Sequence, residues 1–197
     1  MAYTSAALRC EGGPPQYSSI GSPTVATVEQ REEAVLITGV FGAGKSSVAE
    51  EIADILEKRG ASYAVLDLDW LAWFGPEDEH AHQRVLAQNL AAVAGNYRAA
   101  GVRFFVLAYA VPDEAQLESL TVALDMPVKV VRLTLSLSEI RKRLLADVTS
   151  GRQDDLREAA AWLATAKGTG FEGLTLPNDR PIREVASDIL AWLGWAQ

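Results

Sequence analysis

The chain is short and acidic, with 197 residues and a formal net charge of −8. This length suits one domain, and the acidity argues against a protein that binds duplex DNA mainly by charge. The single cysteine, Cys10, excludes an intramolecular disulfide and a cysteine-based zinc site. No apolar run reaches the ~20 residues of a membrane span, and the amino-terminal residues lack the pattern of a secretory signal. We therefore expect a cytoplasmic protein that binds neither nucleic acid nor membranes.

The first thirty residues differ in composition from the rest of the chain. They are rich in glycine, proline, serine and threonine and carry few charges. Such a composition cannot bury enough apolar surface to fold by itself. We therefore predict a flexible tail over residues 1–30 and a single domain over residues 31–197.

Strands and helices alternate along the predicted domain. Short apolar runs that stop at turn residues predict five buried strands, at residues 34–38, 63–66, 102–108, 128–133 and 174–176. Amphipathic stretches predict helices at 46–59, 83–100, from 112, from 136 to 147, 154–166 and 181–193. This order predicts an α/β fold with a mainly parallel five-stranded sheet covered by helices on both faces. Ligands of such folds bind at the carboxyl ends of the strands.

The strongest motif is a glycine-rich loop directly after the first predicted strand. Its sequence, Gly39-Val-Phe-Gly-Ala-Gly-Lys-Ser46, satisfies the phosphate-loop pattern G-x-x-x-x-G-K-[ST]. Glycines allow successive backbone N–H groups to point at one phosphate, and the next helix adds its N-terminal dipole. Lys45 is expected to bridge the terminal phosphates and Ser46 to ligate Mg²⁺. The predicted ATP-binding residues of this segment are Gly39, Phe41, Gly42, Ala43, Gly44, Lys45, Ser46 and Ser47.

With this loop the chain resembles the P-loop kinases of small molecules, such as adenylylsulfate, gluconate and shikimate kinases and chloramphenicol phosphotransferase. The resemblance covers about residues 34–195. It implies the three-layer α/β/α fold of P-loop NTPases with a helical lid at about 137–167. It also implies that the γ-phosphate of Mg-ATP passes to a hydroxyl of a small molecule, here unidentified.

A pair of carboxylates follows the second predicted strand, in Leu66-Asp-Leu-Asp-Trp70. Adenylylsulfate kinases carry D-G-D-N at a similar place. The resemblance implies that Asp69 faces the acceptor hydroxyl and that Asp67 helps to hold the metal through water. Leu68 and Trp70 replace the glycine and asparagine of that pattern, which disfavours adenylylsulfate as the acceptor. Alternatively, one aspartate caps the following helix and the other is solvated.

The third predicted strand ends at Tyr109 and not at an aspartate. An acid at this position would coordinate the metal in a motor ATPase or a switch GTPase. Its absence favours a small kinase, in which the acid of the second strand and water complete the metal shell.

The predicted lid carries several arginines. In the related kinases, lid arginines neutralise charge on the transferred phosphoryl group. The resemblance favours Arg143 and Arg152 as catalytic phosphate contacts, with Arg141 as the next candidate. The alternative is a solvated helix face on which Arg143 pairs with Asp147.

The loop after the last strand, Leu176–Arg180, packs beside adenine in related kinases, so Asn178 is predicted to contact the nucleotide. Alternatively, Asp179 caps the last helix and Pro181 is its first residue.

The acceptor side is less defined by the sequence. Aromatic residues follow Asp69 and would form either the wall of a substrate pocket or part of the core: Trp70, Trp73 and Phe74. Asn89 is a further candidate for an acceptor contact. An apolar face on the Trp192–Trp195 segment would support a homodimer or close the core. We therefore expect an ATP- and Mg²⁺-dependent kinase, or alternatively a nucleotide-binding regulator or slow NTPase without an acceptor.

Overall fold

A computed structural model describes residues 32–75, 78–146 and 152–195 of the chain, so the predicted tail at 1–30 lies outside the described residues. Five strands form one parallel sheet in the order β2-β3-β1-β4-β5, which confirms the predicted fold class. The strands are β1 Glu33–Thr38, β2 Tyr63–Asp67, β3 Phe104–Ala108, β4 Val128–Thr134 and β5 Leu174–Pro177.

Helices connect the consecutive parallel strands, and the last helix follows β5. They are α1 Lys45–Lys58, the 3-10 helix η1 Leu68–Ala72, α2 Glu79–Ala99, α3 Glu114–Leu124, α4 Leu137–Ala146, α5 Arg152–Thr165 and α6 Ile182–Leu193.

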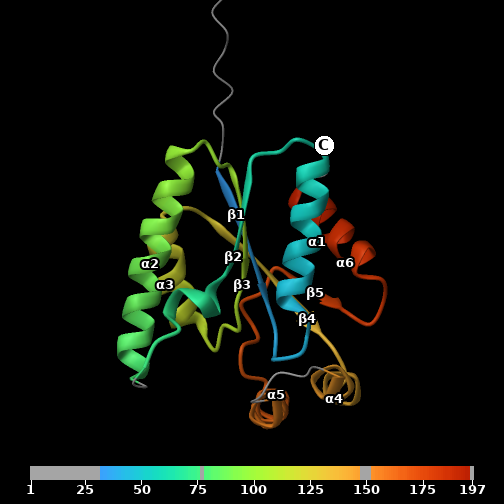
Figure 1. Ribbon diagram of the computed structural model, residues 1–197. Helices are drawn as coiled ribbons and strands as arrows, with labels where there is room; N and C mark the ends of the chain where they lie inside the picture. Colours follow the sequence, from blue (N-terminus) through green and yellow to red (C-terminus); the bar gives the residue numbers. More distant parts are fainter. Residues whose placement is uncertain (1–31, 76–77, 147–151, 196–197) are drawn as a thin grey trace, which may run out of the picture.

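Two apolar cores lie on opposite faces of the sheet. Because side chains alternate along a strand, Val35 and Ile37 of β1 pack on the side of α1 and α6, whereas Ala34 and Leu36 pack on the side of α2 and α3. Figure 1 shows these helix pairs on either side of the sheet, with α4 and α5 at its lower end. The central strand β1 is therefore buried on both faces up to its carboxyl end.

Several predicted features of the helices differ from the structure. Helix α3 begins at Glu114, after the Asp113 cap, and not at Pro112. Helix α2 begins at Glu79 and not at residue 83, because the Asp78 side chain accepts hydrogen bonds from the next backbone N–H groups. The short helix η1 was not predicted, because the preceding strand runs into it without a break residue. The N-cap of α6 is Pro181, with no side-chain cap, so Asp179 does not cap this helix as the alternative reading required.

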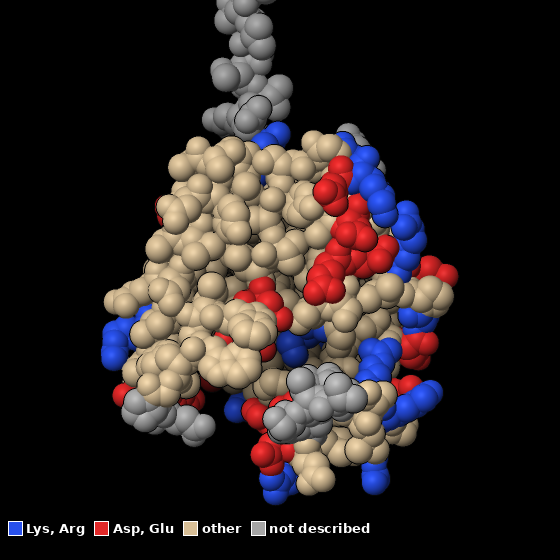
Figure 2. Space-filling model, viewed as in Figure 1, with Lys and Arg blue, Asp and Glu red and all other residues tan. Residues whose placement is uncertain are grey.

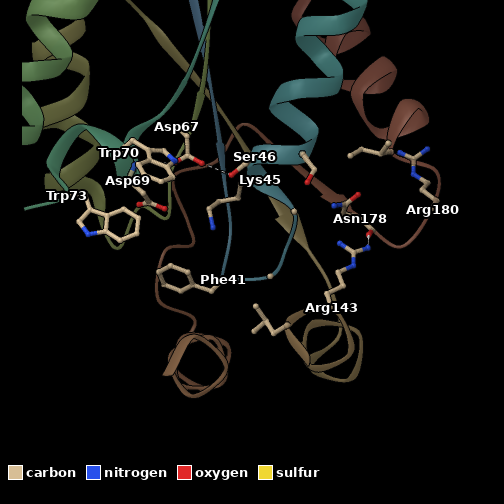
Figure 3. Close-up of a pocket in the computed structure, with 15 residues that line it drawn as sticks. Phe41, Lys45, Ser46, Asp67, Asp69, Trp70, Trp73, Arg143, Asn178 and Arg180 are labelled. Atoms are coloured by element: carbon tan, nitrogen blue, oxygen red, sulfur yellow. Dashed lines mark hydrogen bonds between the residues drawn. The ribbon is translucent and has the colours of Figure 1, made fainter. Parts of the chain in front are cut away.

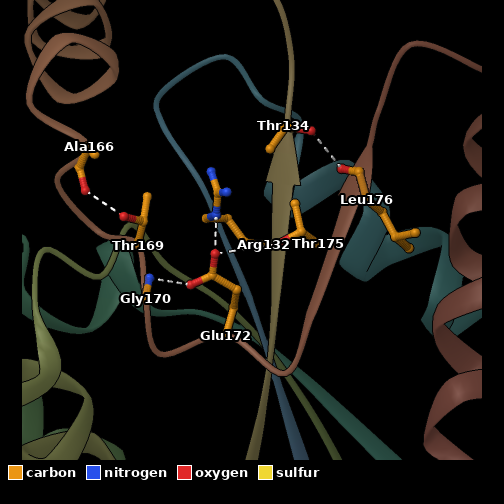
Figure 4. Close-up of polar contacts among 8 residues, drawn as sticks. All are labelled: Arg132, Thr134, Ala166, Thr169, Gly170, Glu172, Thr175 and Leu176. Atoms are coloured by element: carbon orange, nitrogen blue, oxygen red, sulfur yellow. Dashed lines mark hydrogen bonds and ion pairs between the residues drawn. The ribbon is translucent and has the colours of Figure 1, made fainter.

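A polar cluster ties the end of the α5 segment to the sheet (Figure 4). Glu172 accepts hydrogen bonds from Arg132 Nε on β4, at 2.7 Å, and from the backbone N–H of Gly170, at 2.6 Å. Partial burial raises the pKa of Glu172, but the hydrogen bonds and the charge of Arg132 outweigh it and lower this pKa to about 2.

None of the helices that the structure describes is both long enough and apolar enough to cross a membrane.

Candidate functional site

The phosphate loop turns sharply between β1 and α1, and its glycines adopt backbone conformations that other residues avoid. Gly39, Gly42 and Gly44 have φ angles of 139°, 78° and 92°. A Cβ on Gly39 would lie 2.6 Å from the Leu133 carbonyl oxygen on the neighbouring strand. Glycine is therefore required both by the turn and by the close approach of β4.

Two residues from distant parts of the chain hold this loop from its outer side (Figure 3). Asn178 Nδ2 donates a hydrogen bond to the Ala43 carbonyl at 2.7 Å, and Arg143 Nη2 donates to the Asn178 carbonyl at 2.6 Å. Asn178 is buried, and a Cβ on Gly44 would lie only 2.5 Å from its Nδ2 atom. We call Ala43, Arg143 and Asn178 the loop clamp; it connects the phosphate loop with α4 and with the end of β5.

Lys45, the first residue of α1, lies inside the loop. It is 8 % exposed, its Nζ donates to the Val40 carbonyl at 3.3 Å, and it lies 5.1 Å from the centre of the Phe41 ring. Burial lowers the pKa of Lys45, while the nearby carboxylates of Asp69 and Asp67 oppose this shift. The lysine is thus the cation between the loop and the two acids.

Ser46 and Asp67 form the second contact between the loop and β2. Ser46 Oγ donates to Asp67 Oδ2 at 2.6 Å, and Asp67 Oδ1 accepts from the backbone N–H of Asp69 at 3.1 Å. Asp67 therefore caps η1, as the alternative reading proposed, and also faces the loop. A hydroxyl beside a carboxylate fits Mg²⁺, which prefers oxygen ligands and usually keeps waters and substrate phosphates in its shell. The described residues contain no group of three or more His, Cys, Asp or Glu side chains that could hold a metal ion.

Asp69 lies on η1, opposite Lys45. Partial desolvation at the site raises the pKa of Asp69, the Asp67 carboxylate raises it further, and Lys45 opposes the shift. In Figure 3, Asp69, Trp70 and Trp73 stand on one side of Lys45, and Arg143, Asn178 and Arg180 stand on the other.

Two cavities meet at Asp69. The nucleotide cavity, of about 610 Å³, is lined by the loop and by side chains from both of these groups. The second cavity, of about 620 Å³, lies beyond Asp69, between η1, α2, the β3–α3 connection and α5; we call it the acceptor cavity. Asp69, Phe41 and Trp73 line both. Figure 2 shows the molecule hollowed between its body and the lid, with acidic and basic side chains in the hollow.

The structure brings most of the predicted site residues together. The predicted residues that line the nucleotide cavity are Phe41, Gly42, Gly44, Lys45, Ser46, Ser47, Asp67, Asp69, Arg143 and Asn178. Gly39 and Ala43 belong to the loop but not to the wall of this cavity, since they face β4 and the clamp. Helix α5 begins at Arg152, whose side chain is outside the described part of the structure, as is Asp147. Arg141 is exposed on α4 and lines neither cavity.

One predicted acceptor contact, Asn89, lies outside both cavities. Asn89 Nδ2 donates to the Leu71 carbonyl at 2.6 Å, so it holds η1 on α2 and lines neither cavity. Sequence reasoning missed three residues that line the acceptor cavity from separate elements: Gln116, Glu158 and Lys167. They lie on helices and a loop without a motif. Tyr109, at the end of the third predicted strand, and Arg180, in the predicted adenine loop, were identified by position only; Tyr109 lines the acceptor cavity and Arg180 the nucleotide cavity.

The chain shares its fold with solved structures of kinases that act on small molecules. The family model described as adenylylsulphate kinase matches residues 31–96, which span the loop and both aspartates. No curated protein matches the chain.

Solved structures with this fold come from several organisms. A gluconokinase from Sinorhizobium meliloti 1021 is 20% identical, with a TM-score of 0.57, covering 83% of this chain and 92% of its own. The shikimate kinase from Acinetobacter baumannii is 16% identical, with a TM-score of 0.58, covering 85% and 96% respectively. The Deinococcus radiodurans tunicamycin resistance protein is 18% identical, with a TM-score of 0.56, covering 83% and 96%. At these identities the likeness establishes the fold.

Proposed function

We propose that this protein is a kinase that transfers the γ-phosphate of Mg-ATP to a hydroxyl of a small molecule. The observation that carries this proposal is the position of Asp69, on the common wall of two adjoining cavities and opposite Lys45. A carboxylate at the junction can orient an acceptor hydroxyl and accept its proton. A nucleotide-binding regulator would not require a second cavity beside this carboxylate.

The reaction would proceed as an in-line displacement. The acceptor oxygen forms a bond to the γ-phosphorus, the bond to the β,γ-bridging oxygen breaks, and ADP leaves with that electron pair. The hydroxyl proton passes to Asp69. Lys45 binds the phosphates, and Arg143 lies at the lid edge of the nucleotide cavity. Ser46 and Asp67 would hold Mg²⁺, which neutralises charge on the phosphates.

Replacing the junction carboxylate tests this function. In Asp69→Asn the side chain keeps its size but loses the proton acceptor, and we expect transfer to fall by about 10²-fold or more with ATP affinity unchanged within roughly threefold. Product formation with labelled ATP and calorimetry of ATP binding measure the two effects. Asp54→Asn, at an exposed position on α1, is the control and should change neither. Equal transfer by Asp69→Asn and the wild type would remove Asp69 from the mechanism, and hydrolysis of ATP without transfer to any acceptor would favour a slow NTPase.

A further inference from the structure

The charged groups on the wall of the acceptor cavity are mainly acidic. Within the described part of the chain, Lys167 is the one lysine or arginine there, and its ammonium group lies over the Trp162 ring at 4.8 Å. Neither Glu79 nor Glu158 forms an ion pair with another described residue. The carboxylates that line the cavity are those of Asp69, Asp78, Glu79 and Glu158.

Tyr109 lines the same cavity, beside these carboxylates. Burial raises the pKa of its phenol, and the carboxylates of Asp69 and Glu79 raise it further. An anionic ligand would therefore have to approach against several negative charges, whereas a cation would be attracted.

Gln116 provides a second, independent indication of a ligand. This residue lines the acceptor cavity and is 5 % exposed, yet its side-chain nitrogen Nε2 has no hydrogen-bond partner among the described residues. Its backbone N–H donates to the Asp113 side chain at 2.9 Å, which fixes the residue in the first turn of α3. A buried amide donor without an acceptor is costly. A rotation of the side chain that turns Nε2 into the cavity would let a ligand oxygen satisfy it.

Exposed aromatic rings stand where the two cavities meet. Trp70 and Trp73 are 70 % and 74 % exposed, and their ring centroids lie 4.9 Å apart. Trp73 lines both cavities, and Phe74 lines the acceptor cavity. Aromatic faces attract organic cations and offer little to an anion.

From these observations we propose that the acceptor is a hydroxylated organic cation, such as an amino alcohol or an amino sugar. Its hydroxyl would lie at Asp69, its ammonium group near Glu79 and Glu158, and one further oxygen would accept from Gln116 Nε2. The inference rests on the proposed kinase function, because it assigns the substrate class of that site.

Probes of similar size that carry a positive charge, no charge or a negative charge test the inference. Glucosamine, glucose and gluconate share a sugar-like carbon chain, and ethanolamine, ethylene glycol and glycolate repeat the comparison at a smaller size. Binding of each to the full-length chain, loaded with Mg²⁺ and a non-hydrolysable ATP analogue, is measured by calorimetry at slightly acidic pH, where the amines are protonated. Phosphoryl transfer is then measured with Mg-ATP. We expect each cation to bind about tenfold or more tightly than the matching anion.

A pair of variants locates the effect in the cavity. Glu79 and Glu114 are each the first residue of a helix, after an aspartate cap, but only Glu79 lines the acceptor cavity. Glu79→Gln should weaken the binding of the cations by roughly fivefold and leave the neutral probes unchanged, because one carboxylate is lost. Glu114→Gln should change neither.

Each outcome decides one of the two proposals. Tighter binding of gluconate or glycolate than of the matching amine, or no measurable binding of either amine, would overturn the cationic acceptor. An unchanged preference in Glu79→Gln would also contradict it. Selective binding of the amines without phosphoryl transfer would support the cationic site and contradict the kinase function.

Discussion

The nucleotide cavity and the acceptor cavity adjoin at Asp69 but are built in different ways. A contiguous loop, Gly39–Ser46, makes the floor of the first, and its main requirements are backbone conformation and close packing. The second is made by side chains from η1, α2, the β3–α3 connection and α5. For the proposed kinase, phosphate binding would be fixed mainly by the main chain, whereas acceptor recognition would depend on side chains that can change without changing the fold. This division explains how one fold serves kinases of unrelated small molecules.

On the nucleotide side, the largest effect on stability should come from filling the space at Gly44. In Gly44→Ala the new methyl group meets Asn178 Nδ2 and the backbone keeps a φ of 92°, so we expect a loss of about 2–3 kcal/mol of unfolding free energy. Gly60→Ala is the matched control, because Gly60 has a φ of 68° but no atom near its Cβ position, and should cost only about 1 kcal/mol. Urea denaturation measures both, and equal losses would show that the loop clamp imposes no constraint.

A smaller, pH-dependent effect is expected at Glu172. Its pKa in the folded protein is about 2, below the ordinary 4.5, so the carboxylate stabilises the fold fully above the ordinary value and loses this contribution as the pH falls towards 2. Glu172→Gln should lower the unfolding free energy by roughly 1 kcal/mol near neutral pH and by less in acid. Denaturation at a series of pH values, with Glu118→Gln on the exposed face of α3 as the control, checks this sign. A difference that grows in acid would contradict it.

The smallest change in stability is expected on the acceptor side. Trp73 is 74 % exposed, so Trp73→Ala should change the unfolding free energy by no more than about 0.5 kcal/mol. Trp162→Ala removes a ring that is 7 % exposed and should cost about 3 kcal/mol or more. If Trp73→Ala destabilised the protein as strongly as Trp162→Ala, the indole would be a core residue and not a wall of the cavity.

The nucleotide side could be predicted from the sequence because its signals are local. The apolar run of β1, the spacing of the glycines and the amphipathic α1 lie in one short segment, and Lys45 and Ser46 line the nucleotide cavity. Asp67 and Asp69 were found because they directly follow a strand whose carboxyl end lies beside that of β3.

The acceptor side could not be predicted in the same way. Gln116 on α3 and Lys167 after α5 lie far apart in the sequence, and neither belongs to a motif. Asn178 was predicted as a nucleotide contact because it lies in the loop after the last strand. Its hydrogen bond to Ala43, however, depends on how the end of β5 lies beside the phosphate loop. Such contacts arise from tertiary packing, and periodicity carries no information about them. The proposed homodimer, the cytoplasmic location and the roles of the lid arginines remain predictions.

The paired indoles at the cavity junction also have an optical consequence. Trp70 and Trp73 are largely exposed to water, whereas Trp162 and Trp195 are buried. Water lowers the energy of indole emission, so the exposed pair should dominate the long-wavelength part of the spectrum. A molecule seated against these rings would exclude water from them and shift their fluorescence to shorter wavelengths. The protein thus carries its own label at the point where nucleotide and acceptor would meet, and binding can be followed without a chemical dye.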